Sequence, residues 1–334
     1  MYRARAFSKI IKAFDASGPS YNLNKPCFAA SFSSSSSAHP INEVTIIGAG
    51  LMGSGIAQTA AQFGFKVNLI DSSNDALARS RKNIESNLVR ESKKQHGSAV
   101  ASAQIFVNNT MELLTHSTDL TAAAKSSDLL IEAIVENMDA KRKLFTQLDL
   151  IAPKHAIFAS NTSSLPIAEI AKATSRPGQF AGLHFFNPVP VMKLVEIVRT
   201  KDTTEETCKS LALFTDQLLK KAVMCKDTPG FIVNRLLVPY LLEATRIVER
   251  GEASKEDVDL AMKLGAGYPM GPFELMDYVG LDTIKFISDG WYSDSDVLKG
   301  NSHVAPSQLI NGLVAQQKFG KKSGSGFYNY PAKK

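Results

Sequence analysis

The first two-thirds of the chain alternates short apolar runs with longer amphipathic segments. Apolar runs rich in β-branched residues are typical of buried strands, and apolar residues at helical spacing predict helices. The predicted strands are residues 44–47, 66–70, 127–135, 156–160, 180–186 and 192–198, with 222–226 a candidate for one last strand. The predicted helices between them are residues 51–63, 75–95, 138–151, 166–173 and 205–221. This alternation predicts an α/β fold with a doubly wound, mostly parallel sheet.

Beyond Pro229 the pattern becomes almost wholly helical. The predicted helices are residues 231–250, 254–264, 271–289 and 306–318, followed by a turn over 324–328. Asp227 or Thr228 is expected to cap the first of these helices, with Pro229 at its first position. Ser254 is the expected cap of the second helix. This part of the chain therefore predicts a smaller all-α domain that follows the sheet.

The first predicted strand leads directly into Gly48, Gly50 and Gly53, which have the spacing G-x-G-x-x-G. Gly48 allows a sharp turn, Gly50 lets a pyrophosphate approach the backbone, and Gly53 lets the following helix pack closely on the strand. The N-terminus of that helix offers free N–H groups and a partial positive charge to the pyrophosphate. A glycine-rich turn alone gives the same motif. Here strand, glycines, helix, second strand and acid follow in order, which predicts a Rossmann-like dinucleotide-binding domain.

The acid in this series is Asp71, at the end of the second predicted strand. A carboxylate in this window accepts hydrogen bonds from the ribose hydroxyls of a dinucleotide. The same carboxylate repels a 2′-phosphate, and the following Ser72 and Ser73 provide no arginine to bind one. The sequence therefore favours NAD over NADP.

Residues 1–38 differ in composition from the rest of the chain. They hold five basic residues, Arg3, Arg5, Lys9, Lys12 and Lys25, against the single acid Asp15, and end in a serine-rich run. Such composition is typical of a mitochondrial transit peptide, which we expect to be disordered; the alternative is a disordered tail without a targeting role. The remaining residues carry only +2 of the net charge of +6. The high isoelectric point therefore gives little support for nucleic-acid binding.

Composition and spacing argue against several other classes. No apolar run reaches the length of a membrane-spanning helix. The cysteines Cys27, Cys208 and Cys225 are too scattered for a disulfide framework and suit a reducing compartment. No histidine pair has the spacing of a metal site, so no metal is expected, and no G-x-S-x-G elbow is present.

His184 and Glu196 are the strongest candidates for chemistry. His184 lies near the end of a predicted strand, before the loop Asn187-Pro-Val-Pro. In the next strand, alternation places Glu196 among apolar side chains, where a buried acid needs a partner. A carboxylate that orients a histidine makes a general base. The alternative is a histidine whose hydrogen bonds are satisfied within the sheet, and the spacing alone does not decide between them.

Three further features have an ordinary structural explanation beside a functional one. Ser163 lies in a polar cluster at a strand end, where a turn or helix cap is the usual reason for a serine. Asn234, expected in the second turn of the helix that begins at Pro229, is typical of an exposed polar position. The basic face of residues 75–95 is typical of a solvated helix surface, although one or two of its bases could bind a phosphorylated ligand.

Together these motifs resemble the family of mitochondrial short-chain L-3-hydroxyacyl-CoA dehydrogenases, from about residue 41 to 330. The stretches that carry the resemblance are IIGAGLMGSGIAQ (46–58), IEAIVEN (131–137), SNTSSL (160–165), HFFNPVPVMKLVEIV (184–198), DTPGFIVNRLL (227–237), GAGYPMGPFEL (265–275) and FGKKSGSGFY (319–328). The resemblance implies an NAD-binding domain over residues 39–227. It also implies a helical dimerisation and substrate domain over 228–334.

The resemblance also implies a reaction, in which a (3S)-3-hydroxyacyl-CoA is oxidised to the 3-ketoacyl-CoA with NAD in fatty-acid β-oxidation. His184 would be the general base and Glu196 its orienting acid. Ser163 and Asn234 would hold substrate oxygens near His184. The location implied is the mitochondrial matrix, and the assembly implied is a homodimer.

The family's pattern places further residues at the ligands. The cofactor set is Gly48, Ala49, Gly50, Leu51, Met52, Gly53, Asp71, Glu136, Lys141, Ser163, Asn187 and Lys322. Lys94 matches an expected contact to coenzyme A. Asn87 departs from the family, which has a small hydroxyl residue there, so the detail of this contact is open although an amide can still hydrogen-bond.

Two alternatives remain from the sequence. A hydroxyisobutyrate-type β-hydroxyacid dehydrogenase shares the glycine motif and a helical second domain, but uses a catalytic lysine in place of a His–Glu pair. A non-catalytic NAD-sensing protein would be marked by loss of His184 or Glu196, and both residues are present.

Overall fold

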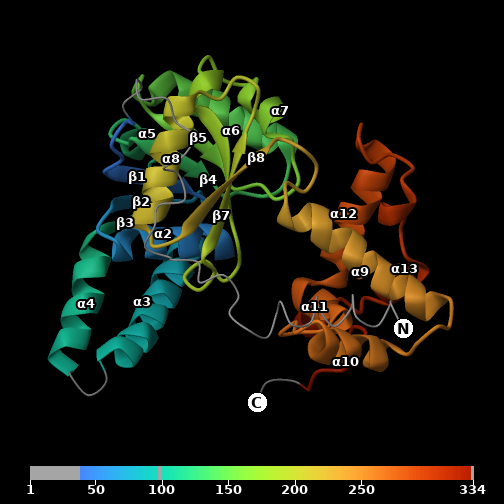
Figure 1. Ribbon diagram of the computed structural model, residues 1–334. Coiled ribbons are helices and arrows are strands. Elements are labelled where there is room, and N and C mark those ends of the chain that lie inside the picture. Colours follow the sequence, from blue (N-terminus) through green and yellow to red (C-terminus); the bar gives the residue numbers. More distant parts are fainter. Residues whose placement is uncertain (1–37, 97–99, 332–334) are drawn as a thin grey trace, which may run out of the picture. The chain divides into compact units, whose positions relative to one another are not determined.

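The structure is a computed structural model that describes residues 38–96 and 100–331, so all but the last residue of the expected leader lies outside the described part. Eight described strands form one sheet in the order β3-β2-β1-β4-β5-β6-β7-β8 (Figure 1). Their bounds are β1 Glu43–Ile47, β2 Lys66–Ile70, β3 Leu114–Ser117, β4 Leu129–Glu132, β5 Ile157–Ser160, β6 Phe180–Phe185, β7 Leu194–Arg199 and β8 Lys221–Lys226. Neighbouring strands are parallel except β6 and β7, which are antiparallel. The predicted α/β class is confirmed.

Helices flank this sheet and bury its central strands. They are α2 Leu51–Gln62, α3 Asn74–His96, α4 Val100–Glu112, α5 Leu120–Ala124, α6 Met138–Ile151, α7 Ile167–Ala171 and α8 Glu205–Gln217, with a short 3-10 turn η1 at Pro177–Gln179. Every residue of β4, β5 and β6 is buried, as expected for strands covered on both faces. Phe145, Phe158 and Phe180 meet edge to face or tilted in the core under α6.

The sequence pattern gave no prediction for β3, α4 and α5. β3 has only four residues, and its sequence Leu-Thr-His-Ser carries one fully buried side chain, Leu114. α4 lies beside α3, with which it forms a helical hairpin, and only Val107 and Thr110 of α4 are buried. Segments this short or this exposed lack the apolar periodicity on which sequence prediction depends.

The described residues after β8 form helices around a second apolar core. They are α9 Val233–Glu249, α10 Lys255–Gly265, α11 Pro272–Val279, α12 Leu281–Asp294 and α13 Gln308–Ala315, with 3-10 turns η2 Ser302–Val304 and η3 Lys321–Ser323. Leu241, Phe273, Met276, Leu281 and Phe327 are among the buried members of this core. The predicted helical domain and the Ser254 cap are both found. None of the described helices has the length and apolar character needed to cross a membrane.

The predicted start of the first of these helices is wrong. α9 begins at Val233, because Gly230 and Phe231 both have positive φ angles, 78° and 52°, and form a turn. Pro229 therefore does not occupy a first helical position, and Asn234 lies in the first turn. Asp227 does not cap α9 either, because its carboxylate accepts hydrogen bonds from the N–H groups of Ile167 and Ala168 and so caps α7.

The predicted single helix over 271–289 is also wrong, because Gly280 divides it into α11 and α12. Gly280 has a φ of 108°, a value outside the range of a right-handed helix. An apolar pattern continues across this residue, so periodicity alone did not reveal the break.

Asp277 of α11 holds the end of the chain in place. Its carboxylate is fully buried and accepts hydrogen bonds from the N–H groups of Phe327 and Tyr328 and from the hydroxyl of Tyr330. Gly326 is required beside it, because a Cβ at that position would lie 2.0 Å from Asp277 Oδ1. The terminal turn predicted from the glycines is thus part of the helical core.

We expect Asp277→Ala to lower the free energy of unfolding by about 2 kcal/mol or more, because it leaves two buried N–H donors without an acceptor. Asp289→Ala is the matched control, since Asp289 makes a partly exposed ion pair with Lys285, worth about 0–1 kcal/mol. Urea unfolding measures both changes. Equal midpoints for the two variants would contradict the role given to Asp277.

Candidate active site

The glycine-rich loop between β1 and α2 has the close packing that the motif predicts. Gly48 has a φ of 110°, and a Cβ there would lie 2.4 Å from the carbonyl oxygen of Ala133. A Cβ on Gly53 would lie 1.8 Å from the carbonyl oxygen of Gly48, so loop and helix touch. A Cβ on Gly50 would meet nothing within 4 Å. The backbone at Gly50 is therefore open to a ligand.

A cavity of about 470 Å³ adjoins this loop and contains Asp71. Asp71 follows β2, and its two carboxylate oxygens accept hydrogen bonds from the N–H groups of Ala49, at 2.8 Å, and Ser73, at 2.9 Å. Ile134, Val135 and Leu144 give the cavity apolar walls. No side chain caps α2, so N–H groups of its first turn, from Leu51 and Met52 onward, remain available to an anion. The residues present therefore fit a dinucleotide.

A buried group of charges lies at the ends of β4 and β5. Lys141 Nζ lies 2.5 Å from Glu132 Oε1 and 3.2 Å from Glu136 Oε2, and the side chains of Lys141 and Glu132 are 1% and 0% exposed. Ser160 Oγ donates a second hydrogen bond to Glu132. The family resemblance implied Lys141 and Glu136 as cofactor contacts, but Glu132 was missed. An acid inside the apolar run Leu-Leu-Ile-Glu was the available signal, the same one that identified Glu196.

Glu136 connects this group to Ser163. Its Oε1 accepts hydrogen bonds from the hydroxyl of Thr162 and from the N–H groups of Ser163 and Ser164. Burial acts to raise the pKa of Glu136, but the charge of Lys141 and the hydroxyl donors outweigh it and hold the pKa below its ordinary value. Glu136 is thus an ionised acceptor that fixes the backbone at Ser163.

His184 and Glu196 form the buried pair that the sequence suggested. They stand opposite each other in the antiparallel pair β6–β7, and His184 Nδ1 lies 2.8 Å from Glu196 Oε2. Ser163 Oγ lies 3.1 Å from His184 Nε2, the other ring nitrogen. The side chains of His184 and Glu196 are 5% and 0% exposed. A carboxylate on one nitrogen and a hydroxyl on the other is the arrangement of a general base.

Glu196 also forms the N-terminal cap of α9. Its Oε1 accepts hydrogen bonds from the N–H groups of Ile232, at 3.1 Å, and Val233, at 2.9 Å. The ring of Phe231 stands edge-on to the His184 ring with centroids 5.5 Å apart. Asn234, half-buried, follows directly in the first turn of α9. The structure therefore brings His184, Glu196, Ser163 and the start of α9 together.

Asn161 and Lys220, which sequence reasoning missed, hold the loop that follows His184 by hydrogen bonds to its backbone. Asn161 Oδ1 accepts a hydrogen bond from the N–H of Phe185. Lys220 Nζ lies 2.5 Å from the carbonyl oxygen of Val189 and 2.7 Å from that of Met192. Burial, with a smaller contribution from Lys193, lowers the pKa of Lys220 to about 8. These contacts fix the loop that carries Asn187, which is exposed.

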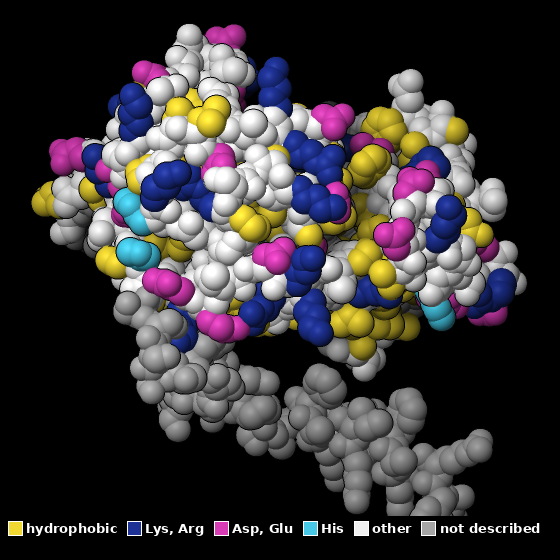
Figure 2. Space-filling view, turned by 90° about the horizontal axis from the view of Figure 1, so that it is seen from above, with side chains coloured by type: hydrophobic (Ala, Val, Ile, Leu, Met, Phe, Trp, Pro, Cys, Tyr) yellow, Lys and Arg dark blue, Asp and Glu magenta, His cyan; other side chains and the backbone are white. Residues whose placement is uncertain are grey.

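Three predicted ligand contacts lie apart from this cluster. Asn87 and Lys94 are on α3, where Asn87 hydrogen-bonds to Gln58 and Arg90, and Lys94 is exposed. Lys322 Nζ lies 2.6 Å from Asp282 and contacts the Phe319 ring. On the face seen in Figure 2, basic and acidic side chains are interspersed, in keeping with the small net charge outside the leader. No group of three potential metal ligands occurs within residues 38–96 and 100–331.

The family follows from comparison with known proteins. Residues 43–228 match the NAD-binding domain of 3-hydroxyacyl-CoA dehydrogenase, and residues 230–330 match the C-terminal domain of the same family. The chain belongs to the 3-hydroxyacyl-CoA dehydrogenase family. This confirms the Rossmann-like domain, the NAD cofactor and the enzyme class that the sequence predicted, and it decides against the hydroxyisobutyrate-type alternative.

Individual relatives agree with this assignment. The chain is 56% identical to the human mitochondrial hydroxyacyl-coenzyme A dehydrogenase over 310 residues, which are 91% of this chain and 98% of the relative. It is 43% identical to a probable 3-hydroxybutyryl-CoA dehydrogenase of Bacillus subtilis, covering 88% of this chain and 99% of the relative. The crystal structure of FadB2 of Mycobacterium tuberculosis superimposes with a TM-score of 0.81 at 41% identity, covering 88% and 100% of the two chains.

Proposed function

We propose that this protein oxidises the 3-hydroxyl group of (3S)-3-hydroxyacyl-CoA thioesters to a ketone with NAD⁺, as a step of fatty-acid β-oxidation. The observation that carries the proposal is the buried His184–Glu196 pair beside Ser163, next to an open dinucleotide cavity. The same observation speaks against a non-catalytic NAD-sensing protein, since such a protein needs no base.

In the proposed reaction the substrate loses a proton and a hydride. Glu196 accepts the hydrogen bond of His184 Nδ1–H and so leaves Nε2 unprotonated, with a lone pair that takes the hydroxyl proton once the substrate hydroxyl replaces Ser163 Oγ there. Bound NAD⁺ would supply the acceptor for the C3 hydride. The buried carboxylate then stabilises the imidazolium, which gives its proton to solvent after the product has left.

Ser163 and Asn234 are the proposed substrate-positioning groups. Ser163 Oγ already hydrogen-bonds at Nε2, the place that a substrate hydroxyl must reach. Asn234 comes one residue after Val233, whose N–H binds Glu196, and its half-buried amide can reach an oxygen of the thioester or the alcohol. These two side chains would orient the reacting carbon between base and cofactor.

The proposed cofactor contacts fall into two groups. Gly48, Gly50 and Asp71 line the open cavity, and the segment from Gly48 to Gly53 together with Asp71 would hold pyrophosphate and ribose. Glu136, Lys141, Ser163 and Asn187 follow or flank the ends of β4, β5 and β6, the side on which parallel sheets bind ligands. Lys141 is buried between two acids, so its effect on the cofactor would pass through Glu136. The contact proposed for Lys322 requires that its ion pair with Asp282 opens.

Coenzyme A would bind along α3. Asn87 lies about two and a half turns before the end of this helix and Lys94 lies in its last turn, and the exposed face of the helix is basic. An ammonium group suits a phosphate, and an amide can replace a hydroxyl as a hydrogen-bonding group.

We also propose a homodimer formed mainly by the helical domain. α9, α10 and α11 expose large apolar side chains, among them Leu236, Leu264 and Tyr278, at 71%, 79% and 47%. Sedimentation equilibrium should give twice the mass of one chain, and a monomer at micromolar concentration would contradict this proposal.

The proposed location is the mitochondrial matrix, with residues 1–38 as a transit peptide. Import of the full chain into isolated mitochondria should shorten it and protect it from protease after the outer membrane is opened. A chain that stays full-length and accessible would contradict the proposal.

We expect His184→Gln to lower kcat by about 10²–10⁴-fold, the usual contribution of a positioned proton acceptor, with little change in NADH affinity. His155→Gln is the matched control, because His155 is a half-exposed partner of Asp128 on the surface. Initial rates from NADH absorbance measure both. Turnover of His184→Gln close to that of the control would refute the assignment.

Asp71→Ala should weaken NAD binding by about 10- to 100-fold, because charge-assisted hydrogen bonds to the ribose are lost. Its relative affinity for NADP should rise, since the repulsion of a 2′-phosphate is removed. Asp75→Ala, an exposed acid in the first turn of α3, is the control. Titration calorimetry measures the affinities of both variants for NAD and NADP. An unchanged NAD affinity in Asp71→Ala would rule out the ribose contact.

A further inference from the structure

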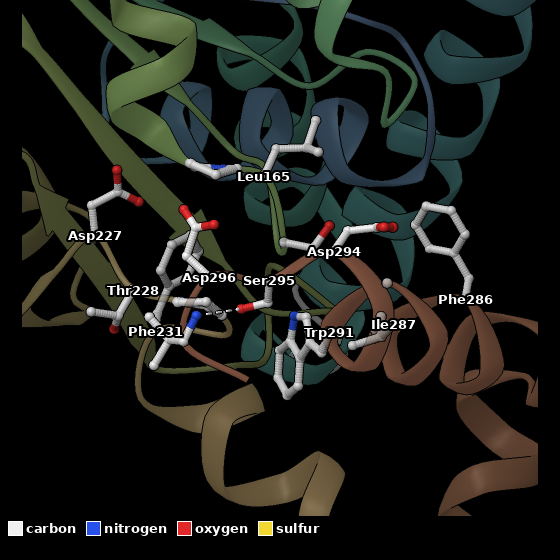
Figure 3. Close-up of a pocket in the computed structure, with 15 residues that line it drawn as sticks. Leu165, Asp227, Thr228, Phe231, Phe286, Ile287, Trp291, Asp294, Ser295 and Asp296 are labelled. Atoms are coloured by element: carbon white, nitrogen blue, oxygen red, sulfur yellow. Dashed lines mark hydrogen bonds between the residues drawn. The ribbon is translucent and has the colours of Figure 1, made fainter. Parts of the chain in front are cut away.

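A second cavity, also about 470 Å³, lies between the loop after β5 and helix α12 (Figure 3). Its apolar walls include Leu165, Pro166, Phe231, Ile287, Trp291 and Val297. Figure 3 shows Leu165 on one side of the cavity and Ile287 and Trp291 of α12 on the other. The volume is within the range of small-molecule sites. None of the residues assigned to cofactor or substrate so far lines it.

This cavity shares two walls with the candidate active site. Phe231 lines the cavity and stands against the ring of His184. Ser164 also lines it and directly follows Ser163, whose hydroxyl meets His184 Nε2. The cavity therefore adjoins the place at Nε2 where the reacting carbon of a substrate would lie.

The charges around the cavity restrict what can occupy it. Asp227, Asp294 and Asp296 line it, and no lysine, arginine or histidine does so among the described residues. The phosphates of coenzyme A are excluded by these carboxylates, and so is a chain that ends in a carboxylate. Because the walls are apolar and the charged residues around them are acidic, the group that matches this cavity is a neutral alkyl chain.

We propose that this cavity receives the alkyl end of the acyl chain and so sets the chain-length preference of the enzyme. The proposal rests on the proposed dehydrogenase function and deepens it. Each methylene buried in the cavity raises kcat/KM by about fourfold until the cavity is filled, as the transfer of a CH₂ group from water predicts. A terminal carboxylate on the chain removes that gain.

Gly290 of α12 provides a sharp test, because it lines the cavity and a Cβ on it would meet nothing within 4 Å. The Cβ of Gly290→Leu therefore meets no neighbour, the rest of the side chain takes up part of the cavity, and leucine favours the helix over glycine. Gly312→Leu is the matched control, since Gly312 of α13 is equally unhindered and does not line the cavity.

The measurement is kcat/KM for 3-hydroxybutyryl-, 3-hydroxyoctanoyl- and 3-hydroxydodecanoyl-CoA. We expect Gly290→Leu to lower kcat/KM for the dodecanoyl substrate by about tenfold or more, and that for the butyryl substrate by less than about twofold. Gly312→Leu should match the unaltered enzyme at every length. An equal effect of Gly290→Leu at all lengths, or none, overturns the proposal.

Two further outcomes separate this proposal from the function on which it rests. Failure of the unaltered enzyme to oxidise 3-hydroxybutyryl-CoA would contradict the proposed function itself. A substrate of dodecanoyl length that carries a terminal carboxylate should be disfavoured, and Asp294→Asn with Asp296→Asn should restore part of its rate. Equal rates for the charged and neutral chains in the unaltered enzyme would overturn the assignment of the cavity.

Discussion

The two hydrogen-bonding sides of the Glu196 carboxylate are the interaction on which the rest of this structure depends. One oxygen holds the imidazole of His184, and the other accepts the first N–H groups of α9. A fully buried carboxylate is costly unless each oxygen is satisfied, and the partial positive charge of a helix N-terminus adds to its stabilisation. The orientation of the base and the attachment of the helical part to the sheet are therefore fixed by the same side chain. The reversal of β7 makes this possible, because antiparallel pairing sets Glu196 directly opposite His184.

A second set of buried charges continues from this pair along the ends of the parallel strands. Glu132, Lys141 and Glu136 lie in contact, and Glu136 holds the backbone of Ser163, whose hydroxyl reaches His184. Buried ion pairs add little to stability but fix geometry when all their hydrogen bonds are satisfied. The site is thus a continuous polar layer between an open dinucleotide cavity and an apolar one.

The sequence predicted most of the sheet and the central pair of residues, because both depend on local patterns. The strand, the glycines, the helix and the acid of the dinucleotide motif follow one another within about thirty residues. Strand alternation placed Glu196 among apolar neighbours, where a buried carboxylate needs a hydrogen-bond partner such as His184. The errors came from features that the pattern does not record. Phe231 adopts a positive φ without being a glycine, so the start of α9 was misplaced, and Gly280 divides a continuous apolar stripe. Glu132 was missed because its partner Lys141 lies on the following helix rather than on a strand.

The hydrogen bonds of Asp277 with Phe327, Tyr328 and Tyr330 have a consequence for folding during synthesis. The described strands of the sheet all precede residue 227, so the dinucleotide-binding part can complete its core while the helical part is still being synthesised. The helical core cannot close until Phe327 has been made, because Phe327 packs against Phe273 and is synthesised well after it. Until Phe327 is in place, α9 to α13 expose apolar faces that attract chaperones or other nascent chains. Termination before Phe327 would thus release a finished sheet joined to an unclosed helical part.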